Sequence, residues 1–236
     1  MKVIKLAPYG MFGTNSYIIS DDDKKAALID APGNTADILK ALEEKGMTLE
    51  YILLTHGHCD HIKGLPEIAE KTGAKVYIHE KDAGKLKDNV QNLTEYFGLA
   101  PIVYDKPVNT VKDNDVIMLG DIGIKVMHTP GHTSGSVMYI AEDCIFSGDT
   151  LFQGSAGRTD MPDGNQCAQN HTMKNIAFRE WEREDYKLYS GHGGESTLKA
   201  ELEHNDFLNY FIKMKKAGFF GDDAALDGIV KTADNV

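Results

Sequence analysis

The chain of 236 residues has few cysteines and no long apolar run. Its three cysteines, Cys59, Cys144 and Cys167, are odd in number and far apart, so we expect neither a disulfide framework nor a Cys-x-x-Cys metal site. No apolar run reaches the roughly 18 residues that a membrane span requires. The N-terminal segment also lacks the long apolar core of a secretory signal, so we expect a cytoplasmic protein with free thiols.

Positive charge is scarce as well. Lys and Arg total 25 against 36 Asp and Glu, which gives a formal net charge of −11 at pH 7. The densest basic segment, at residues 213–216, is short. Because such a surface repels a phosphate backbone, we do not expect a nucleic-acid partner.

No Pro/Gly/Ser-rich linker, low-complexity tract or solenoid repeat divides the chain. Apolar runs bounded by turn residues predict strands at residues 15–20, 25–30, 50–55, 74–79, 115–119, 122–128, 135–141, 143–148 and 187–192. The acidic segment at residues 21–24 predicts a hairpin turn. Periodic apolar positions predict helices at residues 34–46, 65–73, 167–185 and 198–218.

The order of these elements indicates the fold class. The helix at residues 167–185 carries Ile176, Phe178 and Trp181 as candidate core residues, and residues 81–110 are less regular, with a short helix and a surface loop. Consecutive strands, then helices, then strands again predict an α/β protein in which two sheets lie between helices.

Three histidines and one aspartate fall within THGHCDH, residues 55–61, directly after a predicted buried strand. His56 and His58 are two positions apart and can place two imidazoles on one ion. Asp60 and His61 can turn toward a second ion beside it. Imidazole nitrogen and carboxylate oxygen are the usual ligands of catalytic zinc. Four such residues cannot complete two coordination spheres, so further ligands are expected downstream.

Three further candidates follow predicted strands. They are His132 in TPGHTSGS, Asp149 in FSGDTLF and His192 in YSGHGG, and each lies next to a glycine, which permits a tight turn. A lone histidine at a strand end is more often hydrogen-bonded than a metal ligand. Four ligand-type side chains within six positions rarely arise for packing reasons, however. We therefore interpret the whole set as a two-metal site.

The motif His-x-His-x-Asp-His, followed by TPGHTSGS, FSGDTLF and SGHGG, resembles the metallo-β-lactamase superfamily. Within it, the chain is similar to the glyoxalase II-like (hydroxyacylglutathione hydrolase-like) small hydrolases, over residues 3–208. The resemblance implies an α/β (α+β) fold, a four-layer αββα sandwich of two mixed β-sheets flanked by helices. It places a metal site at the edge between the sheets.

The resemblance also divides the chain. It implies a metallo-β-lactamase-fold domain at residues 1–208. Residues 209–236 then form a C-terminal helical extension, which packs on the same domain or on a neighbouring subunit. The second arrangement would make the protein a homo-oligomer.

By the same resemblance, the seven side chains form two metal sites: His56, His58 and His132 for the first, Asp60, His61 and His192 for the second, and Asp149 as a bridge with a water or hydroxide. All are nitrogen or oxygen ligands, which indicates two divalent metal ions. Zinc fits this set, and iron and manganese also accept it. A hydroxide activated there would attack the carbonyl of a small thioester, ester or lactone. Asp60 is the residue expected to orient that hydroxide.

Other residues have weaker assignments. Arg158 resembles a basic residue that contacts the substrate carboxylate in the family, and a salt bridge with Asp160 is an equally weighted alternative. Asp30 resembles a residue that braces the metal loop, with a plain turn role nearly as well supported. Cys59 is expected to fill space, although an exposed thiol there could be oxidised. Core or surface roles are expected for the histidines without partner motifs, His79, His128, His171 and His204.

The chain departs from full-length glyoxalase II after His192. A short acidic segment at residues 193–208 stands where that family carries a helical domain with basic residues for glutathione. This segment matches the compact bacterial type and leaves glutathione recognition open.

The leading hypothesis is a binuclear metal hydrolase acting on a small thioester or ester. The second is a persulfide dioxygenase of the same superfamily, in which His56, His132 and Asp149 alone would resemble a facial triad on one Fe(II). A metal-binding regulator without turnover is the non-enzymatic alternative, and the complete ligand set argues against it. A lactonase stays open, while charge and the short chain disfavour a nuclease.

Overall fold

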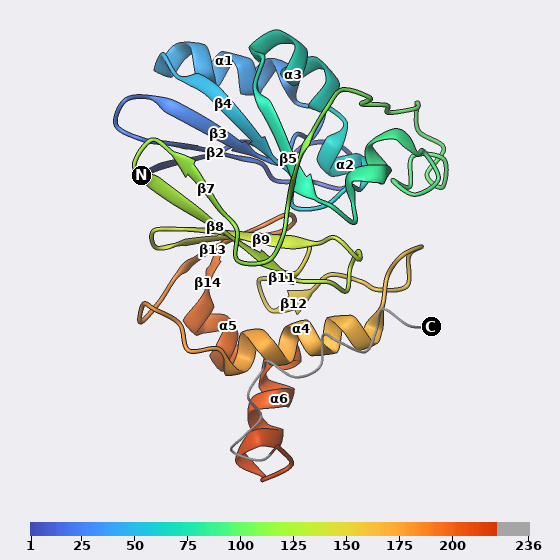
Figure 1. The fold of residues 1–236 in the computed structure, drawn as a ribbon. Helices are drawn as coiled ribbons and strands as arrows, with labels where there is room; N and C mark the ends of the chain where they lie inside the picture. Colours follow the sequence, from blue (N-terminus) through green and yellow to red (C-terminus); the bar gives the residue numbers. More distant parts are fainter. Residues whose placement is uncertain (221–236) are drawn as a thin grey trace.

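Two β-sheets pack face to face, and helices cover the outer face of each (Figure 1). The computed structural model describes residues 1–220 of the chain. Within this part, the layers follow the order helix, sheet, sheet, helix. The predicted αββα sandwich of two mixed sheets is therefore confirmed.

The first sheet comes from the N-terminal half of the chain. It contains β1 (Lys2–Lys5), β2 (Tyr17–Ser20), β3 (Lys25–Ile29), β4 (Thr48–Leu53), β5 (Lys75–His79) and β6 (Asn109–Val111), in that spatial order. Strands β1 to β3 are antiparallel, and β3 to β6 run parallel. The predicted hairpin at residues 21–24 joins β2 to β3.

The second sheet comes from the C-terminal half. It contains β7 (Val116–Leu119), β8 (Ile122–His128), β9 (Val137–Ala141), β10 (Cys144–Gly148), β13 (Lys187–Ser190) and β14 (Ser196–Thr197). Their spatial order is β14-β13-β10-β9-β8-β7, and only β10 and β13 pair in parallel. A small separate ribbon follows β10, made of β11 (Leu151–Phe152) and β12 (Ser155–Ala156).

Helices form the two outer layers. The first sheet is covered by α1 (Thr35–Lys45) and α3 (Leu65–Thr72), and the second by α4 (Gln166–Phe178) and α5 (Leu198–His204). Helix α6 (Asp206–Lys216) packs against α4 and α5 and extends away from the sheet (Figure 1). The short helices α2 (Cys59–Ile62) and η1 (Ala83–Lys87) lie in the connections after β4 and β5. Among residues 1–220, no helix is long and apolar enough to cross a bilayer.

Three apolar cores separate the four layers. Strand β2 shows how one strand serves two of them: Ile18 joins the core that includes residues of α1 and α3, while Tyr17 and Ile19 join the core between the sheets. Successive side chains of a strand point to opposite faces, so a strand covered on both sides is apolar throughout. The third core joins the second sheet to α4, α5 and α6.

The helix predicted at residues 167–185 is shorter than expected. It ends at Phe178, and Arg179 adopts an extended conformation with φ −63° and ψ 136°. Ile176 is buried as predicted, but Trp181 lies beyond the helix and only packs against its core. The Trp181 indole N–H donates to the Ile176 carbonyl at 3.2 Å. The indole thereby satisfies one of the carbonyls that a helix end leaves free.

The prediction of one helix at residues 198–218 is wrong, because the chain breaks at Asn205 into α5 and α6. Asn205 has an extended ψ of 118°, and its side-chain oxygen accepts from the Phe207 N–H, so it caps α6. Its amide N–H₂ donates to the Glu201 carboxylate at 2.8 Å and to the Ser155 carbonyl at 3.0 Å. The buried Asn205 side chain thus caps α6 and pairs with polar groups beside the break, and both contacts stabilise the break.

The predicted boundary between residues 1–208 and 209–236 falls in this same region. Helix α6 runs across position 208, and Leu208 is fully buried in the third core. Residues 221–236 lie outside the described residues. The division therefore stays a prediction, although the first part of the extension packs on the domain.

We expect Asn205→Ala to lower the free energy of unfolding by about 2–3 kcal/mol, because it removes a helix cap and the hydrogen bonds that the Asn205 amide donates to the Glu201 carboxylate and the Ser155 carbonyl. Urea denaturation measures this change. Asn209→Ala is the matched control, since the Asn209 amide makes only an exposed bond to the Glu203 carbonyl. Equal losses of stability in both variants would contradict the role assigned to Asn205.

Candidate metal centre

Seven side chains converge at one edge between the two sheets. The first sheet contributes the loop after β4 and helix α2, which carry His56, His58, Asp60 and His61. The second sheet contributes the turns after β8, β10 and β13, which carry His132, Asp149 and His192. All seven predicted ligand residues are thus brought together by loops at strand ends.

His56, His58 and His132 form one group with ligand atoms within 4.8 Å of one another. His58 Nδ1 lies 2.9 Å from His132 Nε2. All three rings are buried. This group corresponds to the set that the sequence assigns to the first metal.

Asp60, His61 and His192 form a second group. The Nε2 atoms of His61 and His192 are 3.4 Å apart, and they lie 3.5 Å and 3.3 Å from Asp60 Oδ2. Three potential ligand atoms thus face one small volume, as the sequence predicts for a second metal.

Asp149 lies between the two groups. Its Oδ2 is 3.4 Å from His132 Nε2 and 3.3 Å from His192 Nε2, while its Oδ1 is 3.3 Å from His61 Nε2. Strand β10 ends at Gly148, whose φ of 48° is left-handed, and the turn there places Asp149 in the centre. An added Cβ at Gly148 would collide with the Thr55 side chain.

Two imidazoles are oriented by backbone carbonyls. His132 Nδ1–H donates to the Arg158 carbonyl at 2.8 Å, and His192 Nδ1–H donates to the Phe12 carbonyl at 3.0 Å. A backbone carbonyl can only accept, so each ring carries a proton on Nδ1, and its Nε2 atom is the one that faces the centre.

Asp30 orients two more rings. His61 Nδ1–H donates to Asp30 Oδ2 at 2.8 Å. The Thr55 hydroxyl also donates to Asp30 Oδ2 and lies 3.1 Å from His56 Nδ1. Because the one hydroxyl hydrogen is already used, the Thr55 oxygen must accept from His56 Nδ1–H, which leaves the His56 Nε2 lone pair free. Asp30 therefore braces the loop that carries His56 and His61, which agrees with the first of its two predicted roles.

Some buried polar atoms at the centre have no hydrogen-bond partner. Among the described residues they include His56 Nε2, His58 Nε2 and Asp149 Oδ1. Buried polar atoms are seldom left unpaired, and such a group is commonly explained by an ion. With four imidazole Nε2 atoms turned inward and two carboxylates beside them, the donor set fits divalent cations.

The two halves of the centre differ in electrostatics. Burial lowers the pKa of His58 to about 3, and burial with the neighbouring His61 and His58 lowers the pKa of His56 well below its usual value. Burial opposes protonation of His192 too, but Asp149 and Asp60 outweigh it and raise its pKa to about 9. His56 and His58 thus present neutral imidazoles, whereas the surroundings of His192 strongly attract positive charge.

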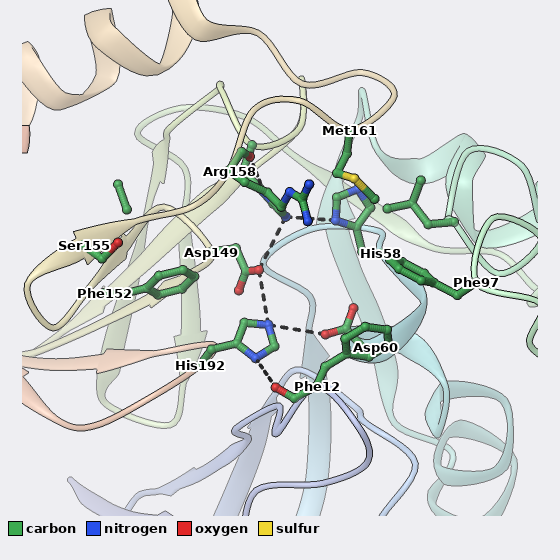
Figure 2. Close-up of a pocket in the computed structure, with 13 residues that line it drawn as sticks. Phe12, His58, Asp60, Phe97, Asp149, Phe152, Ser155, Arg158, Met161 and His192 are labelled. Carbon is green, nitrogen blue, oxygen red and sulfur yellow. Dashed lines mark hydrogen bonds and ion pairs between the residues drawn. The ribbon is translucent and has the colours of Figure 1, made fainter.

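A cavity of about 380 Å³ opens beside the centre (Figure 2). His58, Asp60, Asp149 and His192 form its polar side. The other walls are mostly apolar and come from Phe12, Leu93, Phe97, Phe152, Ala156 and Met161. Its volume falls in the range of small-molecule sites.

Arg158 lines this cavity from the same side as Met161 (Figure 2). Its guanidinium makes two bonds of 2.6 Å with the Asp160 carboxylate, and its side chain is 61% exposed. The structure therefore contains the salt bridge considered above and also places Arg158 at the cavity, so the two assignments are compatible.

The remaining assignments have mixed outcomes. Cys59 is buried in the first core, which raises the pKa of its thiol to about 11, so the exposed thiol considered above is not present. His79 is buried and stacks on His128 with ring centroids 4.1 Å apart, away from the seven ligand residues. His204 is exposed on α5.

Sequence reasoning missed several residues around the centre. Thr14 donates to Asp60 Oδ2 at 2.8 Å, and Thr55 bonds Asp30 and His56 as described above. Phe12 contributes both a carbonyl to His192 and a cavity wall. Thr55 could have been suspected from its place beside the histidine motif, but the segment holding Phe12 and Thr14 carries no motif that points to this site.

Curated relatives resemble this chain over almost all of their length. The probable metallo-hydrolase YqgX of Bacillus subtilis is 33% identical over 207 residues, 86% of this chain and 96% of that protein. Hydroxyacylglutathione hydrolase GloC of Haemophilus influenzae is 30% identical over 211 residues, 87% of this chain and 98% of that protein.

Solved structures share the fold. The BLEG-1 B3 metallo-beta-lactamase superposes with a TM-score of 0.80 at 33% identity and covers 88% of this chain and 99% of its own. TTHA1623, solved in a di-iron-bound form, gives 0.76 at 28% identity and covers 87% and 100%. ETHE1 from Myxococcus xanthus gives 0.71 at 24% identity, with coverage of 97% and 96%, a likeness of fold alone.

The sequence profile of the metallo-beta-lactamase superfamily matches residues 9–193, a segment that includes all seven converging side chains. Together with the αββα sandwich and the relatives above, this match shows that the chain belongs to the metallo-beta-lactamase superfamily, a superfamily of metal-dependent hydrolases.

Proposed function

We propose that the protein is a binuclear metal-dependent hydrolase that cleaves a small thioester or ester, of the hydroxyacylglutathione hydrolase type. One observation carries the proposal. Two groups of nitrogen and oxygen ligand atoms lie side by side, and the Asp149 carboxylate contacts both. A relative with 30% identity bears the name hydroxyacylglutathione hydrolase, which supports the substrate class.

Each group would hold one divalent ion. His56, His58 and His132 would hold the first, Asp60, His61 and His192 the second, and Asp149 would contact both. Among these ligands there is no thiolate, which favours zinc and also admits iron or manganese. Two such ions, when bound, lower the pKa of water and polarise a carbonyl oxygen.

Asp60 is the residue proposed to position the attacking water. Burial alone would raise its pKa, but His61 and the hydrogen bond from His192 outweigh burial and lower it to about 2. The carboxylate is therefore ionised at neutral pH and can accept a hydrogen bond from water. The Thr14 hydroxyl fixes one of its oxygens, which limits the directions that the carboxylate can take.

The cavity favours a small substrate with an apolar part. Aromatic and aliphatic side chains form most of its walls, so an acyl group or thiol carrier can bury apolar surface there. Arg158 is the one arginine or lysine lining this cavity in the described part of the chain. It can bind one carboxylate of a substrate by exchanging its partner Asp160.

Metal analysis and a substrate panel test this proposal. We expect close to two equivalents of metal per chain and hydrolysis of simple thioesters or S-D-lactoylglutathione without oxygen consumption. The panel should include lactones, because a lactonase would use the same site. Oxygen uptake with glutathione persulfide and a single equivalent of iron would instead identify a persulfide dioxygenase and overturn the proposal.

We expect His58→Ala to lower metal content and hydrolysis together. Substitutions beside metal ligands commonly cost 10–100-fold, so loss of a ligand should reduce kcat/KM by more than about 100-fold. Metal content by elemental analysis and turnover are the two measurements. His204→Ala is the control, because His204 is exposed on α5. Full turnover in His58→Ala would contradict the two-ion mechanism.

We expect Arg158→Ala to raise KM for an anionic substrate roughly threefold to tenfold, with a smaller effect on kcat, since an exposed ion pair contributes little. Asp160→Asn should act in the opposite direction and lower KM, because it frees the guanidinium. Steady-state kinetics with a neutral substrate of the same acyl group is the control. Unaltered KM values in both variants would assign Arg158 a structural role only.

A further inference from the structure

We propose that Asp82 is a positioning residue that sets the separation of the two loops carrying the first group of histidines, with Lys85 as its counter-ion. The proposal rests on the proposed function in assigning that group to a metal ion. Asp82 follows β5, its side chain bonds none of the seven candidate ligand residues, and it belongs to no motif recognised in the sequence.

Asp82 is fully buried, and four donors reach its carboxylate. Oδ2 accepts the Gly57 N–H at 2.8 Å and the Thr133 hydroxyl at 2.9 Å. Oδ1 accepts the Gly135 N–H at 2.9 Å and the Lys85 ammonium at 2.6 Å. A carboxylate has about four acceptor positions, so all of them are used.

These contacts link two loops that are far apart in sequence. Gly57 lies between His56 and His58, and Thr133 directly follows His132. The facing atoms of that pair, His58 Nδ1 and His132 Nε2, are 2.9 Å apart. One carboxylate oxygen, Asp82 Oδ2, therefore joins the residues next to both rings and fixes the distance between them.

Lys85 compensates the buried negative charge of Asp82. Its side chain is only 2% exposed, and its ammonium also contacts Asp163 Oδ2 at 2.6 Å. Asp163 in turn accepts the backbone N–H and the hydroxyl of Ser134, in the same loop as His132. Removing one partner of a buried ion pair leaves the other charge uncompensated, which is strongly unfavourable.

The loop that follows His132 packs tightly against Asp82 at Gly135. A Cβ added at Gly135 would lie 2.5 Å from Asp82 Oδ1 and 2.7 Å from its backbone nitrogen. Gly135 therefore permits the close approach that its N–H bond to Asp82 requires. A methyl group at this position would push the His132 loop away while leaving the carboxylate intact.

The second group of ligands is braced by other residues. Thr14 holds Asp60, the Phe12 carbonyl holds His192, and Asp30 holds His61. None of these contacts involves Asp82. A defect at Asp82 should therefore weaken the first metal position and spare the second.

We expect Asp82→Asn to weaken zinc binding at the first position about 10–100-fold, the range typical of residues that orient metal ligands. The new amide keeps the shape of the side chain, but its N–H₂ group must face either the Gly57 N–H or the Gly135 N–H. Two donors then face each other, and one hydrogen bond is lost. Affinity at the second position should stay within about threefold of wild type. Competition of the metal-free protein with a chromophoric chelator for Zn²⁺ measures both affinities without relying on activity.

Three variants complete the experiment. Gly135→Ala should reproduce the loss of zinc affinity at the first position that is expected for Asp82→Asn. It replaces Asp82→Asn in the experiment if that variant does not fold. Asn205→Ala is the stability control, because it should destabilise the fold without changing either zinc affinity. In a His58→Ala background, Asp82→Asn should cause little further loss, since the position that it supports is already impaired.

Wild-type zinc affinity at the first position in both Asp82→Asn and Gly135→Ala would overturn the proposal. An equal loss of affinity in Asn205→Ala would also overturn it, because the effect would then follow stability. If the wild-type protein binds a single ion, the binuclear function fails, yet comparison of the variants for that one ion still tests the role of Asp82.

Discussion

The structure depends on holding five imidazoles and two carboxylates together at one edge of the fold. Without other hydrogen bonds to hold them, polar side chains whose ligand atoms face one another across about 3 Å would move apart or bind water. Outward hydrogen bonds prevent this, because the ring atoms of His61, His132 and His192 that face away from the centre donate to fixed acceptors. Each such bond fixes the orientation of its ring, so the other ring nitrogen faces the centre and the folded chain presents a ready set of candidate ligand atoms.

The sandwich architecture makes this convergence possible. The first sheet supplies the quartet at residues 56–61, and the second supplies His132, Asp149 and His192 from three strand ends. Neither half carries enough ligands for two ions. The apolar core between the sheets therefore does more than stabilise the fold, because it sets the distance between the two halves of the centre. Asp82 joins the same halves by polar contacts close to the rings.

The residues that line the apolar walls of the cavity differ from the residues of the candidate metal centre, so substrate selection and metal binding would depend on different segments. The ligands come from loops at strand ends, whereas the apolar walls come from other segments, among them the region around Leu93 and Phe97 and the ribbon of β11 and β12. Arg158 and its partner Asp160 lie on a further loop at the rim. Such segments can vary without disturbing the ligands, which accords with relatives that share the fold and bear the names hydroxyacylglutathione hydrolase and metallo-beta-lactamase.

The sequence by itself determined the seven side chains of the candidate centre, most strands and the layered fold, because motif spacing and apolar alternation are local properties of the chain. Only the tertiary structure decided that Asn205 divides a helix, that Arg158 lies beside the cavity, and that Thr14 and Asp82 support the centre. Asp82 is 51 residues from Thr133, and Thr14 is 46 residues from Asp60. Contacts between such distant segments depend on how the two sheets and their loops pack, and no local pattern encodes that.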